Sequence, residues 1–576
     1  MIKNNYFTDN ADLQLQFQYL IKFQEVIDEY ENGFEDAKKY SQTGEEQYAL
    51  APQDYNSAKE YYYQVLESFG DITGNYVSQE AAKMDKKGLT LEDGKVIFSE
   101  EMVKLWNMVK DAGLLPFTLK REYKGLGLPV TVFSIIMELL SRADVAFGMS
   151  ISMLNLAETI EKFASKEVKD KWIPKMVASE YTGAMALSEP NYGSDLSSVM
   201  TKAIKQEDGT YLLNGTKRFI THGCGMSNFP AAILTLARTG EAKNGARGLS
   251  FFVVDGKTVQ VAGIEHKLGI KSSPTCEIVY ENSIGEIIGE EGYGLTKYAM
   301  GMMNAARLGT GMFGVGVATA AYEEAKKYAS EREQFGKLIQ DIPAVKKMLD
   351  RKEREIVAMR CLNMEAAFSI DMYRWRQDRL EERGASDREI RKDEKIKYWE
   401  KLASIFTPIC KYYCSEMGNR IAYDSMQVHG GVGFTEEFDV AKLYRDVRIL
   451  TIYEGTTQLQ VIASIGGIIS GMTEKGILRD YLVKLMKQIE ASELSKNIFS
   501  MLENSINLYK ELKEKEYYSF EVVETNARLL TGLLLERSIV NLKENANERR
   551  KQMSKDFNIE SLAIAKANLV KLENAV

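Results

Sequence analysis

The sequence Leu249-Ser250-Phe251-Phe252-Val253-Val254-Asp255-Gly256 lies near the middle of a chain of 576 residues. The run is almost entirely apolar, contains aromatic and β-branched residues, and ends in Asp-Gly, which is typical of a β-strand followed by a turn. Residues 211–215 and 231–236 form similar short runs, and glycines are frequent throughout 183–292. We therefore predict that residues 183–292 form a small β domain.

Helical periodicity flanks this β domain on both sides. Residues 1–182 are predicted to form an N-terminal helical domain, and residues 293–468 a C-terminal helical domain. Residues 469–576 are predicted to form an additional helical tail, for which the simplest interpretation is a solvated appendage. The segments with helical periodicity are 12–30, 102–115, 130–153, 296–331, 343–370, 393–414, 418–428, 480–490 and 520–543.

The composition is that of a soluble globular protein, with 45% apolar and 27% charged residues. A net charge of −8 without a basic patch argues against nucleic-acid binding. Five cysteines without a CxxC pair and only three histidines argue against a metal cluster and fit a reducing compartment. The first residues lack a signal-peptide pattern, and the uncharged stretch 308–322 is shorter than the ~20 residues that span a bilayer. These features predict a cytoplasmic protein without a transmembrane segment.

Residues Gly309-Thr310-Gly311-Met312-Phe313-Gly314 match the dinucleotide pattern GxGxxG. That fingerprint requires a strand before the glycines and a helix that opens at them. Here the glycines lie inside a long helical pattern, and Gly316 and Ala318 continue the row of small residues. We therefore predict a packing seam between helices rather than a nicotinamide site.

Residues 445–460 contain one carboxylate, Glu454, between Tyr453 and Gly455 and after a mostly apolar run. Partial desolvation at such a place favours the neutral carboxyl and raises its pKa, which suits a base that removes a proton next to a carbonyl. Taken alone, a glutamate beside a glycine is more often a surface loop residue.

Four further segments have functional interpretations beside ordinary structural ones. Residues 188–195 combine hydroxyls, glycine and proline, and they form either a donor-rich ligand loop or a tight turn. Residues 219–223 place an aromatic ring and a hydroxyl at a strand end, which fits a flavin wall or a half-buried strand. Residues 331–337 carry an arginine suited to pyrophosphate, or end a helix. The glycine loop 427–434 allows close approach of a phosphate or adenosine, although His429 alone is more often structural.

Taken together, these motifs resemble the acyl-CoA dehydrogenase family of flavoenzymes in order and spacing over residues 100–465. The resemblance implies an N-terminal helical domain, a middle β-barrel-like domain and a C-terminal four-helix bundle, and thus a mainly α fold with a central β domain. It also implies FAD as cofactor and oxidation of an acyl-CoA to the trans-2-enoyl-CoA in fatty acid β-oxidation. An electron-transfer flavoprotein is the implied electron acceptor, and a homodimer or homotetramer the implied assembly.

The resemblance assigns roles position by position. Glu454 corresponds to the catalytic base, whose backbone N–H would polarise the thioester carbonyl together with a flavin ribose hydroxyl. Some family members place the base near Arg307, but no carboxylate adjoins that residue here. Phe219 stands where many members have tryptophan, Met185 where several have an aromatic residue, and Asn304 where some have an acid. The implied cofactor-binding residues are Leu187, Ser188, Phe219, Ile220, Thr221, Arg332, Gln334, Phe335, Gln427, Gly430, Gly431, Thr456 and Gln458. The implied substrate-binding residues are Ser194, Asn304, Arg307 and Gly455.

The extra N-terminal segment 1–95 and the helical tail resemble the larger bacterial members. That subgroup includes enzymes acting on 3-methylthiopropionyl-CoA, and the tail also resembles that of very-long-chain enzymes. Acyl chain length, branching, thioether preference and the natural acceptor stay open. Two alternatives also stay open: an acyl-CoA oxidase that uses O₂, and a non-catalytic flavoprotein scaffold.

Overall fold

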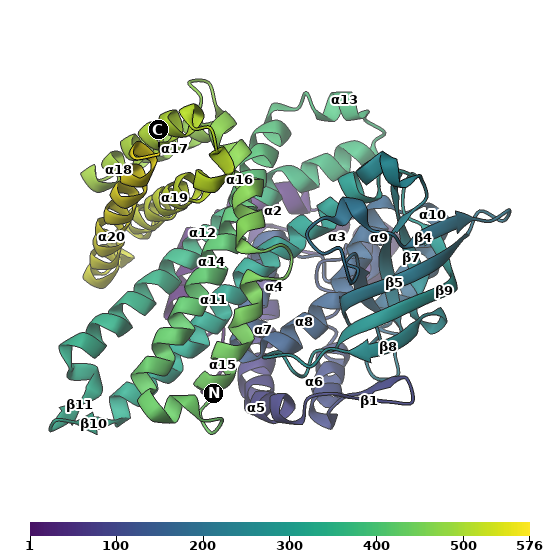
Figure 1. Ribbon diagram of the computed structural model, residues 1–576, viewed down its shortest axis with the longest axis horizontal. Coiled ribbons are helices and arrows are strands. Elements are labelled where there is room, and N and C mark those ends of the chain that lie inside the picture. Colours follow the sequence, from purple (N-terminus) through teal and green to yellow (C-terminus); the bar gives the residue numbers. More distant parts are fainter. Residues whose placement is uncertain (576) are drawn as a thin grey trace.

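The fold was analysed in a computed structural model that describes residues 1–575; the final position of the predicted tail, 576, lies outside this range. Long helices occupy the centre of the molecule, a β domain lies on one side, and a group of C-terminal helices lies on the other (Figure 1). The predicted fold class, mainly α with a central β domain, is confirmed. No helix within residues 1–575 is both long enough and apolar enough to cross a membrane.

The N-terminal region is helical but more interrupted than predicted. The single helix expected over 12–30 is wrong, because the chain is extended at Ile21 between a π-helix and α2. In a continuous helix Phe17 and Phe23 would lie on different faces. The break at Ile21 lets their two rings meet in one core, with their centroids 4.8 Å apart. The elements are α1 Ala11–Leu15, the π-helix Gln16–Leu20, α2 Phe23–Glu31, α3 Glu35–Thr43, α4 Tyr55–Asp71, α5 Ser78–Lys87, α6 Glu100–Asp111, α7 Val130–Ala143, α8 Val145–Ser152, α9 Ala157–Phe163 and α10 Lys166–Val177.

The helix predicted over 130–153 is also divided, at Asp144. This residue is extended and accepts a hydrogen bond from the backbone N–H of Phe147 at 2.6 Å, so it caps the start of α8. Its second oxygen accepts from Lys442 Nζ at 2.5 Å, which links the break to the C-terminal domain. The helix α7 therefore ends at the buried Asp144, whose carboxylate both caps α8 and pairs with Lys442.

The middle β domain is a sheet that closes on itself. Its strand order is β3-β6-β4-β5-β9-β7, with β8 on β9, and a further pairing of β6 with β7 closes the barrel. The run 249–256 quoted above forms β7 and the following turn, and its side chains from Leu249 to Val254 are buried. The strands are β3 Thr182–Ala186, β4 Lys202–Lys205, β5 Tyr211–Thr221, β6 Ala231–Arg238, β7 Leu249–Asp255, β8 Gln260–Ile264 and β9 Thr275–Ile287. Two short hairpins lie outside it, β1 Thr90–Glu92 with β2 Lys95–Ile97 and β10 Glu333–Gln334 with β11 Lys337–Leu338.

Four long helices form the bundle that lies beside the barrel (Figure 1). They are α11 Met300–Glu331, α12 Pro343–Glu382, α14 Glu394–His429 and α16 Thr457–Gly471, with the short α13 Asp387–Ile390 and α15 Asp439–Val447 between them. The prediction of separate helices over 393–414 and 418–428 is wrong, because α14 is continuous. Helix α12 also continues twelve residues beyond the predicted end at Ile370.

Gly418 lies inside α14, where it allows α11 to approach closely, and it does not mark the end of a helix. A Cβ at this position would lie 3.0 Å from the carbonyl oxygen of Gly314 on α11. A Cβ on Gly314 would in turn lie 2.5 Å from the carbonyl oxygen of Cys414, and one on Gly311 would lie 2.8 Å from Cys410 Sγ. The row of small residues therefore forms the predicted helix-packing seam, and the GxGxxG match has no strand before it.

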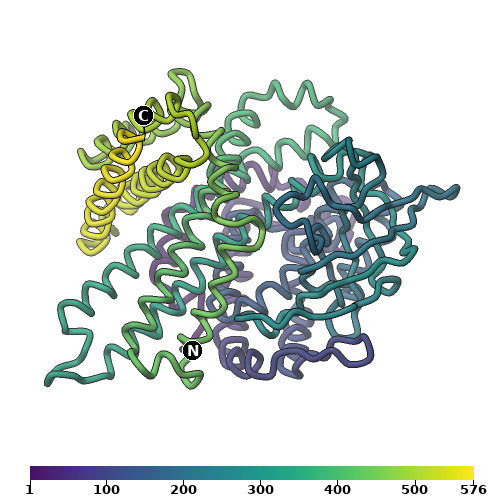
Figure 2. Tube along the Cα trace, viewed as in Figure 1, coloured from purple at the N-terminus to yellow at the C-terminus, as the bar shows by residue number. Residues whose placement is uncertain are grey.

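The C-terminal helices pack against the bundle through buried ion pairs, so the interpretation as a solvated appendage is wrong. In Figure 2 these yellow helices lie beside the green helices of the bundle. The helices are α17 Ile477–Gln488, α18 Glu493–Glu511, α19 Ser519–Leu542 and α20 Glu548–Glu573. The ion pairs between these helices and the rest of the chain include Arg528 with Glu355 at 3.5 Å, Arg550 with Asp12 at 2.6 Å, and Arg537 with Glu365.

Candidate active site

Glu454 lies in a left-handed turn directly before α16. Its φ is 57° and that of Gly455 is 89°, so two consecutive residues have positive φ. Thr456 then caps α16, because its hydroxyl accepts a hydrogen bond from the backbone N–H of Leu459 at 3.4 Å. A non-glycine residue in this conformation is strained and is held only by surrounding contacts, which is common at functional sites.

The contacts that hold the turn come from α14 and α16. Lys411 Nζ donates to the carbonyl oxygen of Gly455 at 2.6 Å. Gln460 Nε2 donates to the carbonyl oxygens of Glu454 and Gly455 at 3.1 Å and 2.9 Å. Both side chains belong to fully buried residues. The orientation of the turn is therefore set from within the bundle.

The environment of Glu454 suits a base that works near neutral pH. Burial raises the pKa of its carboxyl to about 7, while Arg307 and Lys411 favour the charged form and oppose that rise. Burial lowers the pKa of Lys411 to about 8, so its side chain carries a charge at neutral pH. Two cations from two different helices, α11 and α14, therefore favour the ionised form of this carboxyl group.

A flat apolar wall is formed by the β domain. Phe219 is 58% exposed, and its φ of 65° interrupts the extended backbone of the strand. Ile220 is buried beneath it, while Thr221 is half-buried. The backbone N–H of Arg218 donates to the carbonyl oxygen of Ser188 at 3.0 Å, so the predicted loop and the wall adjoin each other.

A buried ion pair supports this loop. Lys217 Nζ donates to the carbonyl oxygen of Leu187 at 2.8 Å and to Glu189 Oε1 at 3.0 Å. The carboxylate of Glu189 also accepts from the backbone N–H groups of Met200 and Thr201. The loop that carries Leu187 and Ser188 is therefore fixed by charged groups beneath it.

The β domain is tied to the segment that leads into the Glu454 turn. The backbone N–H of Ile270 donates to Asp446 at 2.5 Å, and Arg445 donates to the carbonyl oxygen of Leu268 at 3.2 Å. Asp446 and Asp144 both pair with Lys442, which is buried. These contacts join the barrel and the helical domains at one junction.

The predicted substrate residues divide into two groups. Asn304 and Arg307 lie on the first turns of α11, where Arg307 donates to Asn304 at 3.0 Å, and Arg307 also faces Glu454. Gly455 belongs to the turn itself. Ser194 is exposed in the loop of the β domain, and among the hydrogen bonds and ion pairs of residues 1–575 none joins it to the other three.

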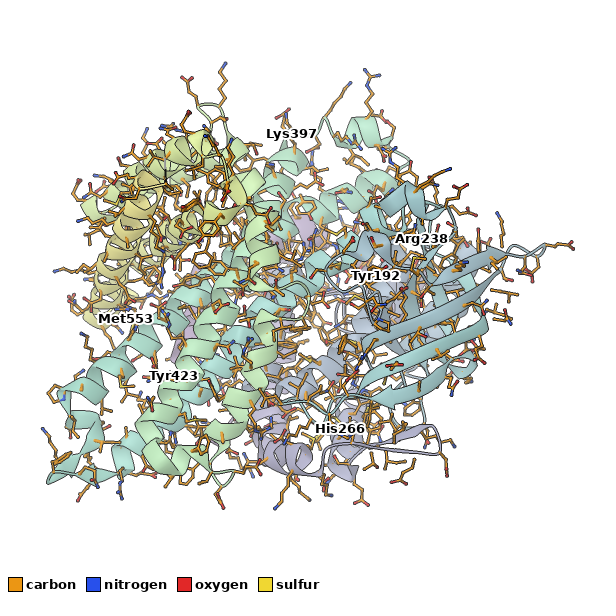
Figure 3. The ribbon with its side chains drawn as sticks, viewed as in Figure 1. Tyr192, Arg238, His266, Lys397, Tyr423 and Met553 are labelled. Atoms are coloured by element: carbon orange, nitrogen blue, oxygen red, sulfur yellow. The ribbon has the colours of Figure 1, made fainter. Side chains whose placement is uncertain are left out.

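Six of the predicted cofactor residues lie at the opposite end of the bundle. Arg332 follows the end of α11, 25 residues after Arg307, which places the two about 37 Å apart along the helix. Figure 3 shows the same separation through two labelled neighbours of the predicted residues. Tyr423 on α14, four residues before Gln427, and Tyr192 in the loop that carries Ser188 lie in different parts of the molecule. The six residues are exposed: Arg332, Gln334, Phe335, Gln427, Gly430 and Gly431.

The residues at both ends fit the parts of FAD. Phe219 offers an exposed aromatic ring, over which the guanidinium of Arg218 lies at 5.1 Å, and the residues Ser188 and Thr221 are half-buried and bring hydroxyls for the polar edge of a ring. At the other end, a Cβ on Gly430 or Gly431 would have no neighbour within 4 Å, so this backbone is open to a ligand. Arg332 adds a forked cation suited to phosphate.

Sequence reasoning missed the residues that hold these sites in place. These residues are Lys411, Gln460, Lys217 and Glu189. Glu189 and Gln460 lie within the segments 188–195 and 445–460 but were given no role there, and Lys411 is 43 residues from Glu454. The available signal was a lysine within an otherwise apolar helix segment, Ile405 to Tyr413. A charge at a core-facing position indicates a specific partner.

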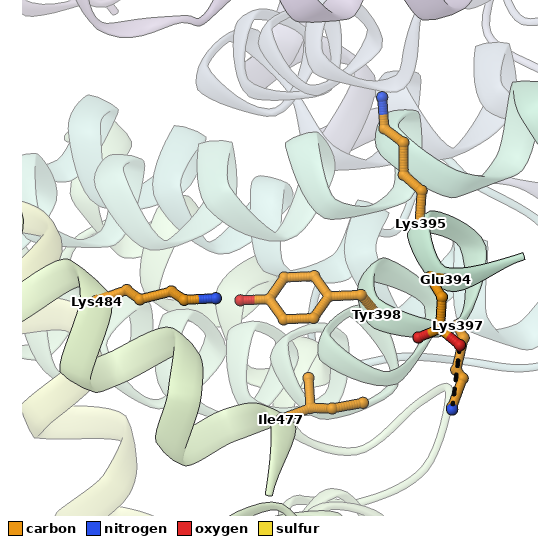
Figure 4. A pocket seen from close by; sticks show the side chains of 6 residues that line it. All are labelled: Glu394, Lys395, Lys397, Tyr398, Ile477 and Lys484. Atoms are coloured by element: carbon orange, nitrogen blue, oxygen red, sulfur yellow. Dashed lines mark ion pairs between the residues drawn. The ribbon is translucent and has the colours of Figure 1, made fainter. Parts of the chain in front are cut away.

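A groove of about 520 Å³ lies elsewhere, between the start of α14 and α17 (Figure 4). Lys484 and Tyr398 point toward each other across it, with Ile477 beside them. Its lysines are neutralised by carboxylates, for example Lys484 by Asp480 at 2.8 Å. None of the predicted site residues lines it.

The chain matches the family models of all three acyl-CoA dehydrogenase domains. The N-terminal domain matches residues 63–180, the middle domain 184–283, and the C-terminal domain 294–377 and 393–465. A 3-methylmercaptopropionyl-CoA dehydrogenase of Ruegeria pomeroyi is 36% identical over 413 residues, which cover 69% of this chain and 68% of that protein. A 3-(aryl)acrylate reductase of Clostridium sporogenes is 34% identical, over 64% of this chain and 90% of the other.

Solved structures agree in fold. The structure of an acyl-CoA dehydrogenase from Bacillus anthracis, complexed with FAD, covers 90% of this chain and 89% of its own, with a TM-score of 0.74 and 22% identity. That coverage extends beyond the three matched domains into the C-terminal helices. Motifs, fold and relatives agree: this chain belongs to the acyl-CoA dehydrogenase family, the FAD-dependent oxidoreductases that act on CH–CH groups.

Proposed function

We propose that this chain oxidises an acyl-CoA thioester at its α and β carbons, with Glu454 as the base that removes the α proton. The observation that carries the proposal is the Glu454 turn, where a half-buried carboxylate has a pKa near 7 and is held in a strained conformation. Bound FAD would supply the hydride chemistry that side chains cannot perform. Leu187, Ser188, Phe219, Ile220 and Thr221 would form the wall and edge contacts for its ring.

The residues of the turn would position and activate the substrate. The backbone N–H of Glu454 would donate to the thioester carbonyl oxygen, which makes the α proton more acidic. Arg307, Asn304 and Ser194 would contact the CoA side. Thr456 and Gln458 would complete the cofactor contacts next to the base.

Anaerobic addition of acyl-CoAs of graded chain length, including a thioether-containing one, tests this proposal. The expected result is bleaching of the flavin absorbance by at least one of them. Absence of bleaching with the whole panel would contradict the proposal and favour a flavoprotein scaffold. Peroxide release in air would instead identify an oxidase.

The reductase among the relatives calls for a second measurement. The same base and cofactor contacts serve the reverse reaction, in which Glu454 would return a proton to the α carbon. Reoxidation of the reduced flavin by 2-enoyl-CoA or 3-arylacrylate thioesters would show which direction is faster. An electron-transfer flavoprotein as acceptor and a cytoplasmic location stay predictions from the sequence.

The pH dependence follows from the pKa of Glu454. The carboxyl must be ionised to accept a proton, so kcat/KM is expected to rise about tenfold per pH unit below an apparent pKa near 7 and to level off above it. Stopped-flow measurement of flavin reduction across this range provides the profile. A profile that is flat through neutral pH would remove Glu454 as the titrating base.

We further propose that FAD is shared between two copies of the chain. Arg307 beside Glu454 and Arg332 at the far end are about 37 Å apart on one helix, so within one chain the far-end residues lie a long way from the base. The far end also exposes Phe335 at 92% and Phe434 at 84%. Apolar side chains that exposed favour burial against a second copy.

Phe335→Ser is therefore expected to weaken both assembly and FAD retention, because it removes apolar area from the shared site. Tyr517→Ser is the matched control, since Tyr517 is 77% exposed and lies between α18 and α19, outside the predicted cofactor residues. Light scattering after size-exclusion chromatography gives the mass, and the flavin-to-protein ratio gives retention. A Phe335 variant with unchanged mass and unchanged flavin content would contradict the shared site.

A further inference from the structure

Lys411 makes an unusual contact with the turn that carries Glu454. Its ammonium group is buried within the bundle and donates to the carbonyl oxygen of Gly455 at 2.6 Å. Removal of an ammonium group from water is costly unless opposite charge or several acceptors compensate. A neutral donor would satisfy the carbonyl without that cost, and Gln460 already donates to the same oxygen at 2.9 Å. The charge of Lys411 therefore needs a role beyond this hydrogen bond.

The surroundings of the carboxylate indicate that role. The charged groups that act on Glu454 are Arg307 from α11 and Lys411 from α14, and the adjacent Tyr453 is a further titratable group that Glu454 affects. Lys411 in turn faces Glu454 and Glu416. Arg307 is half-buried and already donates to Asn304, whereas Lys411 is shielded from solvent. Solvent and salt screen a buried charge less than an accessible one.

The geometry of the turn adds a second link. Glu454 and Gly455 both have positive φ, and such a turn persists only where surrounding contacts fix it. The two carbonyl groups are held by Lys411 and Gln460 alone among the hydrogen bonds within residues 1–575. Loss of Gln460 would leave the Glu454 carbonyl without a donor, and loss of Lys411 would leave both carbonyl groups bonded to Gln460 alone.

We propose that Lys411 is a positioning residue of this reaction, which fixes the Glu454 turn through the Gly455 carbonyl and stabilises the ionised base with its charge. The proposal rests on the proposed function of Glu454 as the base. Gln460 shares only the first of the two roles, because it is neutral. The two roles can therefore be separated by variants of these two residues.

The test uses the FAD-loaded protein in four variants. Lys411→Met removes the positive charge and one hydrogen-bond donor, whereas Lys411→Arg keeps both. Gln460→Leu removes a neutral donor. Lys352→Met is the matched control, because Lys352 is another buried lysine whose Nζ has no hydrogen-bond partner within residues 1–575. The Glu454 carboxyl is titrated by infrared difference spectroscopy, with the band assigned by its absence from Glu454→Gln. Flavin reduction by acyl-CoA is measured on the same samples.

The expected results differ between the variants. In Lys411→Met the Glu454 titration moves to higher pH by about one unit, because a nearby cation no longer favours the ionised form. Flavin reduction at neutral pH then falls about fivefold, since a rise in the Glu454 pKa from about 7 to about 8 lowers the ionised fraction at pH 7 from about one half to about one tenth. In Gln460→Leu the rate falls while the titration stays in place. Lys411→Arg restores the titration, and Lys352→Met leaves it unchanged.

Two results would overturn the proposal. One is a Lys411→Met protein that titrates and reacts like the original. The other is a slower Lys411→Met protein with an unshifted Glu454 titration, since that would leave Lys411 with a purely structural role. The infrared titration needs no substrate, so it distinguishes failure of this proposal from failure of the proposed function, in which no acyl-CoA bleaches the flavin of the original protein.

Discussion

Replacing Glu454 by glutamine is expected to slow flavin reduction by acyl-CoA by about 10²- to 10⁴-fold, the usual contribution of a positioned base. Glutamine keeps the shape of the side chain but cannot accept a proton. Because the turn is held through the carbonyl groups of Glu454 and Gly455, the substitution leaves its hydrogen bonds in place. Anaerobic stopped-flow absorbance measures the rate.

FAD content and thermal midpoint should match those of the original protein, which shows that only the chemistry was removed. Glu454→Asp is the companion variant. It keeps a carboxylate on a shorter side chain, so its rate of flavin reduction should lie between those of the original protein and of Glu454→Gln. Near-normal flavin reduction in Glu454→Gln would end the assignment. Rapid reduction in both variants would point to a base elsewhere on α11 or α14.

Gly314→Ala is expected to destabilise the protein by about 2 kcal/mol, although alanine is the better helix former. Its Cβ would lie 2.5 Å from the carbonyl oxygen of Cys414, so α11 and α14 would have to separate. Backbone atoms cannot move aside as a side-chain tip can. Denaturant unfolding followed by circular dichroism gives the change.

Gly466→Ala on α16 is the matched control. Gly466 is exposed, and a Cβ there would have no neighbour within 4 Å, so the substitution should be neutral or stabilise by up to about 1 kcal/mol. Equal effects from the two substitutions would mean that the seam tolerates wider helix spacing. The contrast between them isolates packing from helix propensity.

Local pattern predicted the type of most elements but not their ends. The strand β7 could be predicted because the apolar run 249–254 is followed directly by the turn residues Asp255 and Gly256. The continuity of α14 could not be seen, because Gly418 serves the approach of α11, which is a tertiary contact. For the same reason the break at Ile21 was missed, since it depends on which core Phe17 and Phe23 share.

The candidate site was predictable to the extent that its motifs are local. Glu454, Phe219 and Ser188 lie in short recognisable segments, and the resemblance ordered them. The roles of Lys411 and Gln460 were not foreseen, because both side chains reach the turn through tertiary contacts. Gln460 belongs to the segment 445–460, but the sequence does not show that its side chain turns back to the carbonyl groups of Glu454 and Gly455. The far-end residues near Arg332 were foreseen, but one chain leaves them exposed.

The pairing of Asp12 with Arg550 bears on how the chain folds during synthesis. The two partners are separated by 538 residues, so the first exists long before the second has left the ribosome. Arg360 also pairs with Asp12, at 2.9 Å, and becomes available midway. The carboxylate would therefore be neutralised in two stages, and the final packing of the N-terminal helices would be completed only when α20 arrives. Synthesis that stalls before residue 550 would leave a nearly finished enzyme whose first helices are still incompletely anchored.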